Sequence, residues 1–513
     1  MHSILERLHQ VVENHLSTIA FASCKEKYTY KELWRAISSV ANILTKPSLS
    51  KGPVLVYGES DFYTLASLLG ANMAGYAYVP VDSHSPFARV KMIIEACKPY
   101  AIIVTLQKEL DDELKAFLSQ YQVFYRELFD AEKPITDLKD MVHDEDTNYI
   151  IYTSGTTGVP KGVEVSYNNL LSFTEWMMHD FKQIEQNQVL LQAPFSFDLS
   201  IFSIYPTLLS GGTLVSLSRE ETTNFKYLFE RLNTTGINTW ISTPSFVDIC
   251  LLDPSFVQKK HRKLEQFIFC GEELTIKTAQ KLLERFPDAT VWNTYGPTEA
   301  TGSVTQLKVT KDLLTKHDRL PLGKAKPGVE IQIHDPKTRQ KVSFGERGEI
   351  VIIGDSVAKG YYQDDIKTQA VFATVDKRSA YYTGDAGKID GTGQLFYDGR
   401  IDFQIKMNGF RIELQDIEAH LAAFAEVNKA VILPQINADN KVRALVAVVV
   451  PNEKVADEKQ FVKSLRKRLI LEIMDYMMPQ RFVLMDKFSL NHNGKIDRKL
   501  LSEKLLKVGG NFK

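Results

Sequence analysis

The sequence predicts an α/β fold, with a large N-terminal domain of doubly wound α/β sheets and a small α+β C-terminal domain. Strand-like apolar runs alternate with helical runs from about residue 53, which calls for helices on both faces of mostly parallel sheets. Near residue 328 the pattern changes to short strands between Gly and Asp clusters, which is typical of a β-rich subdomain. We therefore expect an N-terminal core over 1–401, with a β-rich subdomain at about 325–398, and a C-terminal domain over 402–513.

The N-terminal alternation begins with an amphipathic helix. Thr29 and Glu32 match a capping box, and Leu33, Ile37 and Val40 follow at helical spacing. Runs of β-branched and aromatic residues then predict strands, and the longer runs between them predict helices. In order, we expect a strand at 53–57, a helix at 62–74, and strands at 76–81 and 101–104.

The C-terminal part of the chain is predicted to hold shorter elements. They lie between Gly and Asp clusters, where apolar residues alternate or form brief runs. A turn near Asp402 separates the β-rich stretch from a compact α+β unit that ends in a basic tail. The expected strands are 329–333, 348–352, 394–397, 430–433 and 444–450, and the expected helix is 458–471.

Composition and charge exclude several classes of protein. With 44% hydrophobic and 24% charged residues the chain can bury large cores, and its net charge of −1 lacks the basic excess of a nucleic-acid binder. No signal peptide is indicated at the N-terminus, and the apolar run 444–450 stops at Pro451, too short to span a bilayer. The four cysteines are scattered, which favours a reduced compartment and no zinc site. We therefore expect a cytoplasmic protein without membrane insertion and without a nucleic-acid partner.

The most informative stretch is the loop 152–162, Tyr-Thr-Ser-Gly-Thr-Thr-Gly-Val-Pro-Lys-Gly. Strands are expected on either side of it, at 149–152 and 163–165, with a helix following at 167–178. Glycines let backbone N–H groups approach an anion closely, and the hydroxyls and lysine add donors and positive charge. Gly162 stands where a Walker A loop has Ser or Thr, so a different phosphate loop is indicated, although a Gly/Thr surface turn also fits. The candidate phosphate ligands are Thr153, Ser154, Gly155, Thr156, Thr157 and Lys161.

Two further motifs carry carboxylates. The stretch 293–299 offers a planar amide, an aromatic face and, in Glu299, a carboxylate suited to Mg²⁺, but a Gly-Pro turn with an exposed glutamate is an equal interpretation. The stretch 382–385 places Asp385 at a strand end, where it could accept hydrogen bonds from ribose hydroxyls or be an ordinary loop aspartate.

Two more stretches follow in the C-terminal part. Within 399–414, Asn408-Gly409 is a hairpin turn signal between two alternating segments, whose charged flanks a hairpin alone does not explain. The turn 493–498 presents Lys495 near the C-terminus. A single loop lysine of this kind is usually solvated surface.

Taken together, these stretches resemble the motifs of the adenylate-forming (ANL, AMP-binding) superfamily, in order and spacing from residue 152 to 498. The resemblance implies ATP and Mg²⁺ as cofactors, with Glu299 holding the metal and with Glu299 and Lys495 as the catalytic residues. It also implies that the C-terminal domain is mobile and turns about a hinge at Asp402. The implied ATP site consists of Thr153, Ser154, Gly155, Thr156, Thr157, Lys161, Asn293, Thr294, Tyr295, Gly296, Pro297, Thr298, Asp385, Tyr397, Asp398, Gly399, Arg400 and Lys495.

The resemblance also bears on the acid that is activated. Amino-acid-activating members have an aspartate at the position of Asp198, where it pairs with the substrate ammonium group. Asp198 could instead cap the following helix. A buried charge would not suit a fatty acyl chain, so an amino acid is implied. The implied substrate residues are Phe197, Asp198, Cys270, Gly302 and Lys495, with Leu199, Phe202 and Phe269 completing a bulky apolar lining.

Two positions in that lining are informative. Cys270 is implied to lie beside the substrate methyl group and to help select the D-enantiomer, while a small buried hydrophobic residue is an equal interpretation. Gly302 departs from the family pattern, because a valine is expected there. A bulky apolar lining leaves room for only a small substrate side chain.

Within the superfamily, the chain most resembles members that load D-alanine onto a small carrier protein. The resemblance implies formation of D-alanyl-AMP, transfer to the phosphopantetheine thiol of a D-alanyl carrier protein, and D-alanylation of (lipo)teichoic acid; we expect a monomer. Alternatives are another small amino acid or a carboxylic acid, passed to a carrier protein or to coenzyme A, and a nucleotide-binding module without ligase activity. The basic residues that could dock an acidic carrier, or simply form a solvated helix face, are Lys495, Arg498, Lys499, Lys504 and Lys507.

Overall fold

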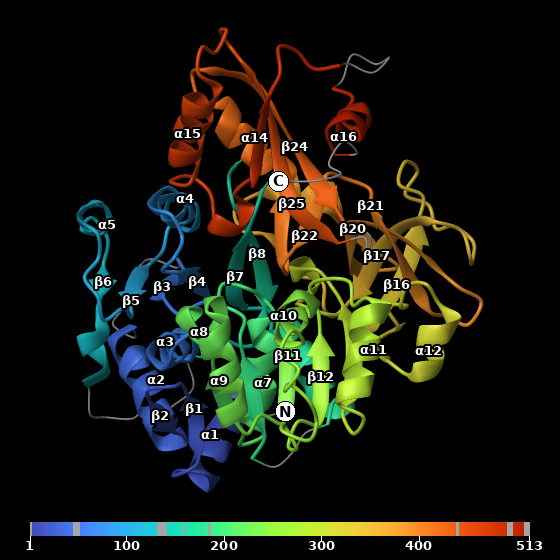
Figure 1. Ribbon diagram of the computed structural model, residues 1–513. Helices are drawn as coiled ribbons and strands as arrows, with labels where there is room; N and C mark the ends of the chain where they lie inside the picture. The colour runs from blue at the N-terminus through green and yellow to red at the C-terminus, as the bar shows by residue number, and fades with distance from the viewer. Residues whose placement is uncertain are drawn as a thin grey trace. The chain divides into compact units, whose positions relative to one another are not determined.

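The computed structural model describes residues 3–44, 52–130, 141–155, 158–182, 186–437, 441–489 and 496–506 (Figure 1). The chain divides into two compact units. The first unit contains Met1–Ser83, Ile94–Tyr152 and Gly162–Ile401, and the second contains His84–Ile93, Thr153–Lys161 and Asp402–Lys513. The domain boundaries expected from the sequence remain predictions.

One sheet of the first unit has nine strands, in the order β15-β14-β13-β12-β11-β9-β10-β1-β2. Its inner strands pair in parallel, whereas β2, β14 and β15 at the two edges pair antiparallel. The strands are β1 (Ile19–Ala22), β2 (Lys27–Thr29), β9 (Gln188–Leu191), β10 (Thr213–Ser216), β11 (Thr239–Ser242), β12 (Gln266–Phe269), β13 (Thr290–Tyr295), β14 (Thr305–Lys308) and β15 (Lys324–Ala325).

A second sheet has seven strands, in the order β18-β8-β7-β4-β3-β5-β6. Strands β3, β4, β5, β6 and β7 pair in parallel, and the short β18 pairs antiparallel with β8. The strands are β3 (Val54–Gly58), β4 (Tyr78–Asp82), β5 (Ala101–Val104), β6 (Val123–Phe124), β7 (Thr147–Thr153), β8 (Lys161–Ser166) and β18 (Gly360–Tyr361).

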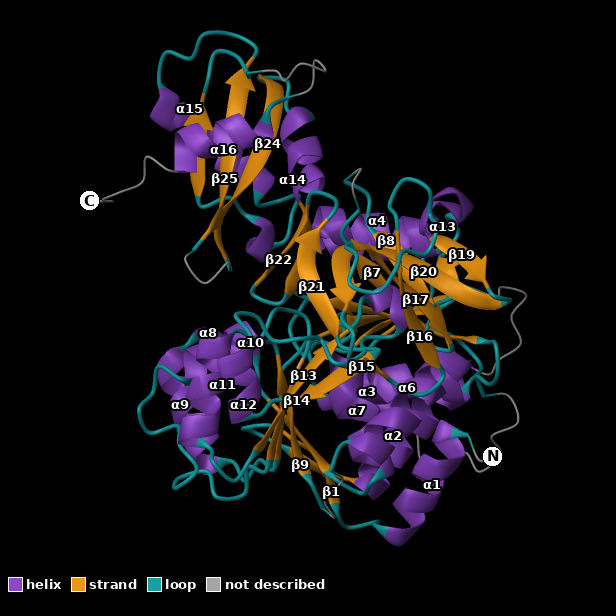
Figure 2. Cartoon of the chain, turned by 90° about the vertical axis from the view of Figure 1, so that its right-hand side faces the viewer, coloured by secondary structure: helices purple, strands orange, loops and turns teal. Residues whose placement is uncertain are grey.

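Helices cover both faces of the nine-stranded sheet (Figure 2), with α8 to α12 on one side and α2, α3, α6 and α7 on the other. Both faces need a cover because the strands carry apolar side chains on both. In β12, Phe267 and Phe269 pack into one core cluster, and Ile268 between them packs into the other. This arrangement confirms the predicted doubly wound α/β class. The helices are α1 (Ile4–Asn14), α2 (Tyr30–Leu44), α3 (Phe62–Met73), α4 (Phe87–Cys97), α5 (Asp112–Leu118), α6 (Tyr167–Asp180), α7 (Ser200–Leu209), α8 (Arg219–Thr223), α9 (Phe225–Thr234), α10 (Pro244–Cys250), α11 (Ile276–Arg285), α12 (Lys311–Lys316) and α13 (Asp365–Val371), with 3₁₀ turns η1 (Arg126–Asp130) and η2 (Thr298–Ala300).

Helix α2 begins with the capping box that the sequence predicts. The backbone N–H of Thr29 donates to the carboxylate of Glu32 over 2.7 Å, and the N–H of Glu32 donates to the Thr29 hydroxyl over 3.3 Å. Leu33, Ile37 and Val40 are buried along one face of the helix. Local capping and the apolar stripe therefore agree on the position of this helix.

The β-rich part of the first unit is an antiparallel sheet in the order β16-β17-β20-β19, with β21 paired to β20. Apolar residues of β16, β17 and β20 share a core cluster with the buried side chains that follow β13. This cluster connects the β-rich sheet to the end of the nine-stranded sheet. The strands are β16 (Val329–His334), β17 (Gly348–Gly354), β19 (Phe372–Val375), β20 (Arg378–Ile389) and β21 (Leu395–Arg400).

The C-terminal part of the second unit has a hairpin and a three-stranded sheet, β24-β25-β26. The hairpin turns at Asn408 (φ 52°) and Gly409 (φ 85°), both left-handed as an Asn-Gly hairpin turn requires. In β25, Leu445, Ala447 and Val449 enter the core cluster with α14 and α15, while the residues between them enter the cluster with α16. Burial on both faces explains the continuous apolar run. The elements are β22 (Gln404–Met407), β23 (Phe410–Glu413), α14 (Leu414–Ala422), β24 (Val427–Ile436), β25 (Val442–Pro451), α15 (Glu458–Leu469), η3 (Asp475–Met477), β26 (Arg481–Leu484) and α16 (Arg498–Leu506).

Two further features concern the whole described chain. No described helix combines the length and the apolar character needed to cross a membrane. All four cysteines are free thiols, of which Cys24 is exposed and Cys97, Cys250 and Cys270 are buried.

Candidate active site

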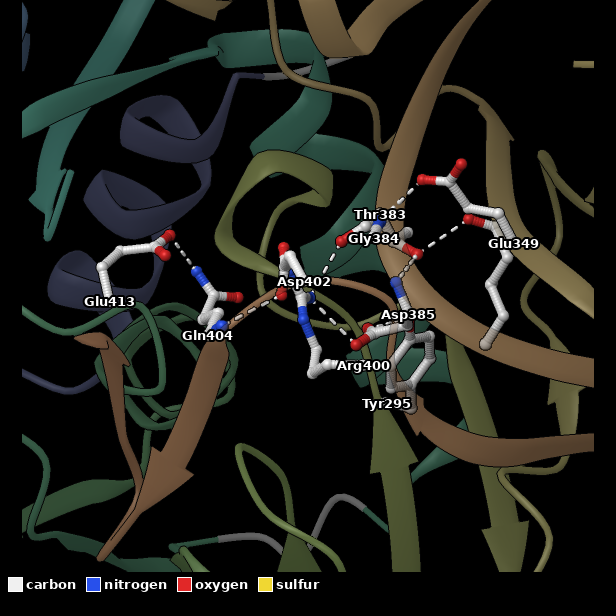
Figure 3. Close-up of polar contacts among 10 residues, drawn as sticks. Tyr295, Glu349, Thr383, Gly384, Asp385, Arg400, Asp402, Gln404 and Glu413 are labelled. Atoms are coloured by element: carbon white, nitrogen blue, oxygen red, sulfur yellow. Dashed lines mark hydrogen bonds and ion pairs between the residues drawn. The ribbon is translucent and has the colours of Figure 1, made fainter. Parts of the chain in front are cut away.

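Asp385 lies at the centre of a buried polar cluster in the first unit (Figure 3). It stands opposite Arg400 in the antiparallel pair of β20 and β21. Arg400 donates from Nη1 to Oδ1 of Asp385 over 2.9 Å, and Tyr295 donates from its hydroxyl to Oδ2 over 2.6 Å. Burial, reinforced by Asp385, raises the pKa of Tyr295 well above its ordinary value, so Tyr295 remains a donor. A carboxylate has about four acceptor sites, so this one also has capacity for ligand hydroxyls.

Short-range contacts shape the backbone around Asp385. The Thr383 hydroxyl donates to the carbonyl of Ile350 over 2.8 Å and accepts from the N–H of Asp385 over 3.0 Å. Gly384 has a φ of 69°, which favours glycine, and its N–H donates to the carboxylate of Glu349 over 2.8 Å. Burial raises the pKa of Glu349 above its ordinary value. These contacts fix the direction of the Asp385 side chain.

Glu299 is a second buried carboxylate, on the 3₁₀ turn η2. It has no exposed surface, and the hydroxyl of Tyr361 donates to its Oε1 over 2.8 Å. Its own carbonyl accepts from the N–H of Ala358 over 2.9 Å, which fixes the turn against the 354–358 segment. Within the described ranges, no group of three or more His, Cys, Asp or Glu side chains could hold a metal ion. A hard carboxylate oxygen nevertheless fits Mg²⁺ that takes its other ligands from phosphate and water.

The loop predicted to bind phosphate joins β7 to β8 and belongs to the second unit. The Thr153 hydroxyl donates to the carbonyl of Lys161 over 3.5 Å, and Ser154 is buried. A Cβ at Gly155 would lie 2.1 Å from the carbonyl oxygen of Val159, so the tight turn requires glycine. Two predicted phosphate ligands, Thr156 and Thr157, lie outside the described residues.

The predicted adenine motif begins at the end of β13. Asn293 donates from its amide to the carbonyl of Pro321 over 3.0 Å, and the Thr294 hydroxyl donates over 2.9 Å to the carbonyl that ends β12. A Cβ at Gly296 would lie 2.5 Å from the Cα of Ser303, so only glycine fits. These contacts hold the turn in place next to Tyr295. Of the remaining motif residues, Pro297 is the N-cap of η2 and Thr298 is the first residue of that turn.

Tyr397 on β21 belongs to a second charged group in the first unit. The guanidinium carbon of Arg319 lies 5.5 Å from the centre of the Tyr397 ring. Arg319 also donates from Nε to Oε1 of Glu273 over 2.8 Å, which raises the pKa of Arg319. Burial raises the pKa of Tyr397 above its ordinary value. Strand β21 also carries the predicted ligands Asp398, Gly399 and Arg400.

Sequence reasoning did not assign roles to Arg319, Glu273 or Tyr361. A single arginine between short elements carries no local signal, and Tyr361 follows a glycine outside every motif. Glu273 is the exception, because it stands three residues after Cys270, which sequence reasoning assigned to the substrate lining. Its pairing with Arg319, 46 residues further along the chain, could be found only in three dimensions.

Asp198 lies just before α7 and is 7% exposed. The N-cap residue of α7 is Leu199, whose side chain makes no capping hydrogen bond. The backbone carbonyl of Asp198 accepts from the N–H of Ile201 over 3.1 Å. Asp198 therefore lies one position before the N-cap of α7, and its buried carboxylate is a candidate partner for a substrate ammonium group. The neighbouring Phe197 is partly buried and packs against the core cluster that contains the apolar residues of α7.

Cys270 and Gly302 lie in contact, because the Cys270 thiol donates to the carbonyl of Gly302 over 3.5 Å. Leu199, Phe202 and Cys270 all belong to the core cluster that contains α7. Phe269 belongs to a different core cluster, so its predicted place in the substrate lining is wrong. It points to the opposite face of β12, because successive residues of a strand alternate between faces.

In the second unit, the predicted hinge residue Asp402 precedes the β22–β23 hairpin. Its Oδ1 accepts from the N–H of Gln404 over 3.1 Å, and the Gln404 amide donates to Glu413 across the hairpin (Figure 3). The hairpin base is thus held by side chains as well as by the strand ladder. The predicted catalytic lysine, Lys495, lies outside the described residues.

Comparison with known proteins gives a family match and full-length relatives. A family model for AMP-binding enzymes matches residues 8–362. The D-alanine–D-alanyl carrier protein ligase of Lactococcus lactis is 53% identical over 505 residues, covering 98% of this chain and 99% of its own length. The ligase of the same name from Listeria monocytogenes is 42% identical over 516 residues, covering 98% and 99%.

Solved structures share the fold at low sequence identity. The adenylation domain AlmE of Vibrio cholerae, in complex with glycyl-adenosine-5'-phosphate, has a TM-score of 0.82 at 21% identity, covering 98% of each chain. The nonribosomal peptide synthetase protein PA1221, with adenylation and peptidyl carrier domains, has a TM-score of 0.80 at 24% identity. It covers 98% of this chain and 84% of its own.

Proposed function

The chain belongs to the AMP-binding enzyme family, and we propose that it activates D-alanine as D-alanyl-AMP and passes it to a carrier protein. The acceptor is the phosphopantetheine thiol of a D-alanyl carrier protein, and the product serves D-alanylation of (lipo)teichoic acid. The observation that carries the choice of substrate is Asp198, a buried carboxylate beside an apolar lining. An amino acid brings an ammonium group to this carboxylate, and a short side chain suits the lining.

In the first half-reaction, a carboxylate oxygen of D-alanine attacks the α-phosphorus of ATP and pyrophosphate leaves. This chemistry rests on positioning and on stabilising negative charge that develops at the α-phosphate. We assign the β- and γ-phosphates to the loop from Thr153 to Lys161, and the charge stabilisation to Lys495. Asp198 orients the amino acid through its ammonium group.

The nucleoside half of ATP is assigned to the cluster around Asp385. Asp385 accepts hydrogen bonds from Arg400 and Tyr295, which fix the direction of its carboxylate. Ribose hydroxyls would donate to its remaining acceptor sites in charge-assisted hydrogen bonds. Adenine is assigned to the turn from Asn293 to Thr298.

Magnesium is assigned to Glu299, whose buried carboxylate is held by Tyr361. Bound Mg²⁺ would neutralise phosphate charge during adenylation. The role of the chain here is to hold the Glu299 carboxylate in a fixed direction through Tyr361.

In the second half-reaction, the thiol sulfur attacks the carbonyl carbon of D-alanyl-AMP. The bond to the phosphate oxygen breaks, the thiol proton is lost, and the products are a thioester and AMP. We propose that the chain from Phe403 onward turns about Asp402 between the two steps, which removes Lys495 and brings Lys406 to Arg411 to the site. Hinged rearrangement about one or a few residues is an established class of motion. Since the reaction consumes ATP, we expect it in the cytoplasm, and we expect a monomer.

The test is amino-acid-dependent exchange of labelled pyrophosphate into ATP, measured with D-alanine, L-alanine, glycine, D-serine and acetate. D-alanine is expected to give the highest kcat/KM. A higher value for acetate would overturn the amino-acid assignment, and a higher value for another amino acid would overturn the choice of D-alanine.

A further inference from the structure

Arg498 is the first residue of helix α16 and stands three positions after Lys495 in the sequence. Its guanidinium donates from Nη2 to Oε2 of Glu418 on α14 over 2.6 Å, and from Nη1 to the carbonyl of Ile432 on β24 over 3.2 Å. Glu418 accepts from the N–H of Ile432 at its other oxygen, Oε1, over 2.7 Å. These three hydrogen bonds form a closed ring that joins α14, β24 and the start of α16.

The ring holds the Arg498 side chain in one orientation. Strand β24 lies at an edge of its sheet, and the pair of Arg498 and Glu418 satisfies backbone groups there. The two side chains are only 20% and 14% exposed, and the planar guanidinium has a fixed fork of donors. Its carbon also lies 4.5 Å from the centre of the Phe403 ring, next to the proposed hinge. Arg498 is therefore fixed to three separate parts of the second unit.

The segment that carries Lys495 is closed at its base. The N–H of Asp497 donates to the carbonyl of Ser489 over 2.9 Å, so the described residues on either side of the segment are bonded to each other. The carboxylate of Asp497 accepts from the N–H of Leu500 over 2.9 Å at the start of α16. Leu501 then packs without exposed surface into the cluster between α16 and the β24–β25 pair (Figure 2). The base of the segment and α16 are thus fixed to one sheet.

We propose that Arg498, through its pair with Glu418, is a positioning residue for Lys495. The inference rests on the proposed function, which assigns charge stabilisation at the α-phosphate to Lys495. A lysine on a long side chain can supply this stabilisation only if its backbone is placed accurately. Arg498 sets that place, because it ties the chain just beyond Lys495 to α14, to β24 and to Phe403. Its role is indirect, and it acts through Lys495.

The sequence left another interpretation of Arg498, as a basic residue that docks an acidic carrier. The two interpretations concern different half-reactions. A positioning residue for Lys495 affects the formation of D-alanyl-AMP, whereas a docking residue affects transfer to the carrier. The low exposure of Arg498 and its pairing with Glu418 favour the positioning role.

R498A tests the positioning role in each half-reaction. The kcat for D-alanyl-AMP formation should fall about 100-fold, since a misplacement of about 1 Å can cost that much. The KM values for ATP and D-alanine should stay nearly unchanged, because the lost interaction acts in the transition state. Transfer from supplied D-alanyl-AMP to the holo carrier should keep its wild-type rate. R498K keeps the charge without the planar fork, so it should show a smaller loss in the same step and serves if R498A folds poorly.

Arg468 on α15 provides a matched control. It pairs with Glu426, and its guanidinium carbon lies 3.9 Å from the centre of the Phe424 ring. R468A therefore removes another paired and stacked arginine from the same unit, far from Lys495 in the sequence. It should lower the stability to urea and leave both half-reactions at their wild-type rates.

Glu418 tests whether the effect passes through the pair. E418Q keeps an oxygen that can accept from the N–H of Ile432, but it loses the charge that holds Arg498. D-alanyl-AMP formation should slow in E418Q, though less than in R498A. The double variant should be no slower than R498A alone, because residues that act through one contact are not additive.

The outcomes separate the inference from the proposed function. If R498A and R498K slow D-alanyl-AMP formation no more than R468A, or if E418Q adds its full effect to that of R498A, the positioning role is wrong. If R498A slows only transfer to the carrier, Arg498 is a docking residue and the inference is equally wrong. If the wild-type protein forms no D-alanyl-AMP, the proposed function itself is wrong.

Discussion

Tyr295 and Asp385 are joined by a hydrogen bond of 2.6 Å between the tyrosine hydroxyl and Oδ2. Tyr295 ends β13 of the nine-stranded sheet, and Asp385 lies on β20 of the antiparallel sheet. The two residues are 90 positions apart in sequence. Their contact therefore connects the proposed adenine turn with the proposed ribose carboxylate.

Tyr295→Phe should weaken ATP binding without removing the Asp385 carboxylate. A hydrogen bond to a charged group contributes about 1.5–3 kcal/mol, so ATP affinity should fall roughly tenfold or more. Isothermal titration with ATP measures this change. Tyr227→Phe, a matched change at an exposed tyrosine of α9, is the control and should leave affinity unaltered. Equal affinities in the two variants would refute the positioning role.

Asp198→Ala should impair the use of D-alanine while leaving ATP binding nearly intact. Removing one partner of a buried ion pair costs about 3–5 kcal/mol, which corresponds to orders of magnitude in kcat/KM for D-alanine. Steady-state exchange kinetics with each substrate varied in turn measure both effects.

A capping residue provides the control for Asp198. Asp457 caps α15 through its side chain, so Asp457→Ala should lower stability by roughly 1 kcal/mol without affecting D-alanine. If Asp198→Ala behaves like Asp457→Ala, Asp198 has only a structural role.

Lys326 gives a prediction about stability and pH. It is 2% exposed, and its Nζ donates to the Ser172 hydroxyl over 2.7 Å. Burial lowers its pKa from 10.5 to about 8, although Asp355 opposes the shift. Between these values the unfolded chain binds more protons than the folded chain, so the contribution of Lys326 to stability rises with pH.

The Lys326→Met variant isolates this contribution. From pH 7 to pH 9.5, the free energy of unfolding of the wild type should gain roughly 2 kcal/mol relative to Lys326→Met, because each pKa unit corresponds to about 1.4 kcal/mol. Urea unfolding of both proteins at the two pH values gives the comparison. A difference that does not change with pH would show that the lysine titrates normally in the folded chain.

Lys495→Ala should separate the two half-reactions. Loss of a group that stabilises charge in the transition state lowers the rate about 10²- to 10³-fold, so D-alanyl-AMP formation should nearly stop. Transfer of D-alanine to the carrier from supplied D-alanyl-AMP should continue. Substitution of Gly409, whose φ is 85°, should have the reverse effect by distorting the hairpin. Rapid-quench measurement of each step tests both variants, and equal slowing of both steps in both variants would contradict the hinged mechanism.

The fold was predictable where local patterns and burial agree. The run 444–450 is apolar at every position because β25 is buried on both faces, and Asn408-Gly409 adopts the turn that its residue types favour. The misplaced residue, Phe269, shows the limit of this reasoning. Its neighbour Cys270 was assigned to the same lining, but alternation along the strand sends the two side chains to opposite faces.

The site was predictable as a set of motifs but not as a set of contacts. Asp385 and Arg400 could be named from sequence, whereas their pairing follows from the register of β20 and β21. Lys326 gave no signal, because a lysine between Ala325 and Pro327 looks like any exposed turn residue. Burial of an ionisable group is a property of the assembled layers, and no local pattern encodes it.

Loading of a phosphopantetheine carrier protein tests the central claim most directly. The enzyme, ATP, Mg²⁺ and D-alanine are incubated with the holo or the apo form of a D-alanyl carrier protein, and the carrier is weighed by intact mass spectrometry. The account predicts that one D-alanyl group, labile to hydroxylamine, appears on the holo carrier only and requires ATP. A holo carrier that stays unloaded while D-alanyl-AMP accumulates, or equal loading of the apo carrier, would contradict it.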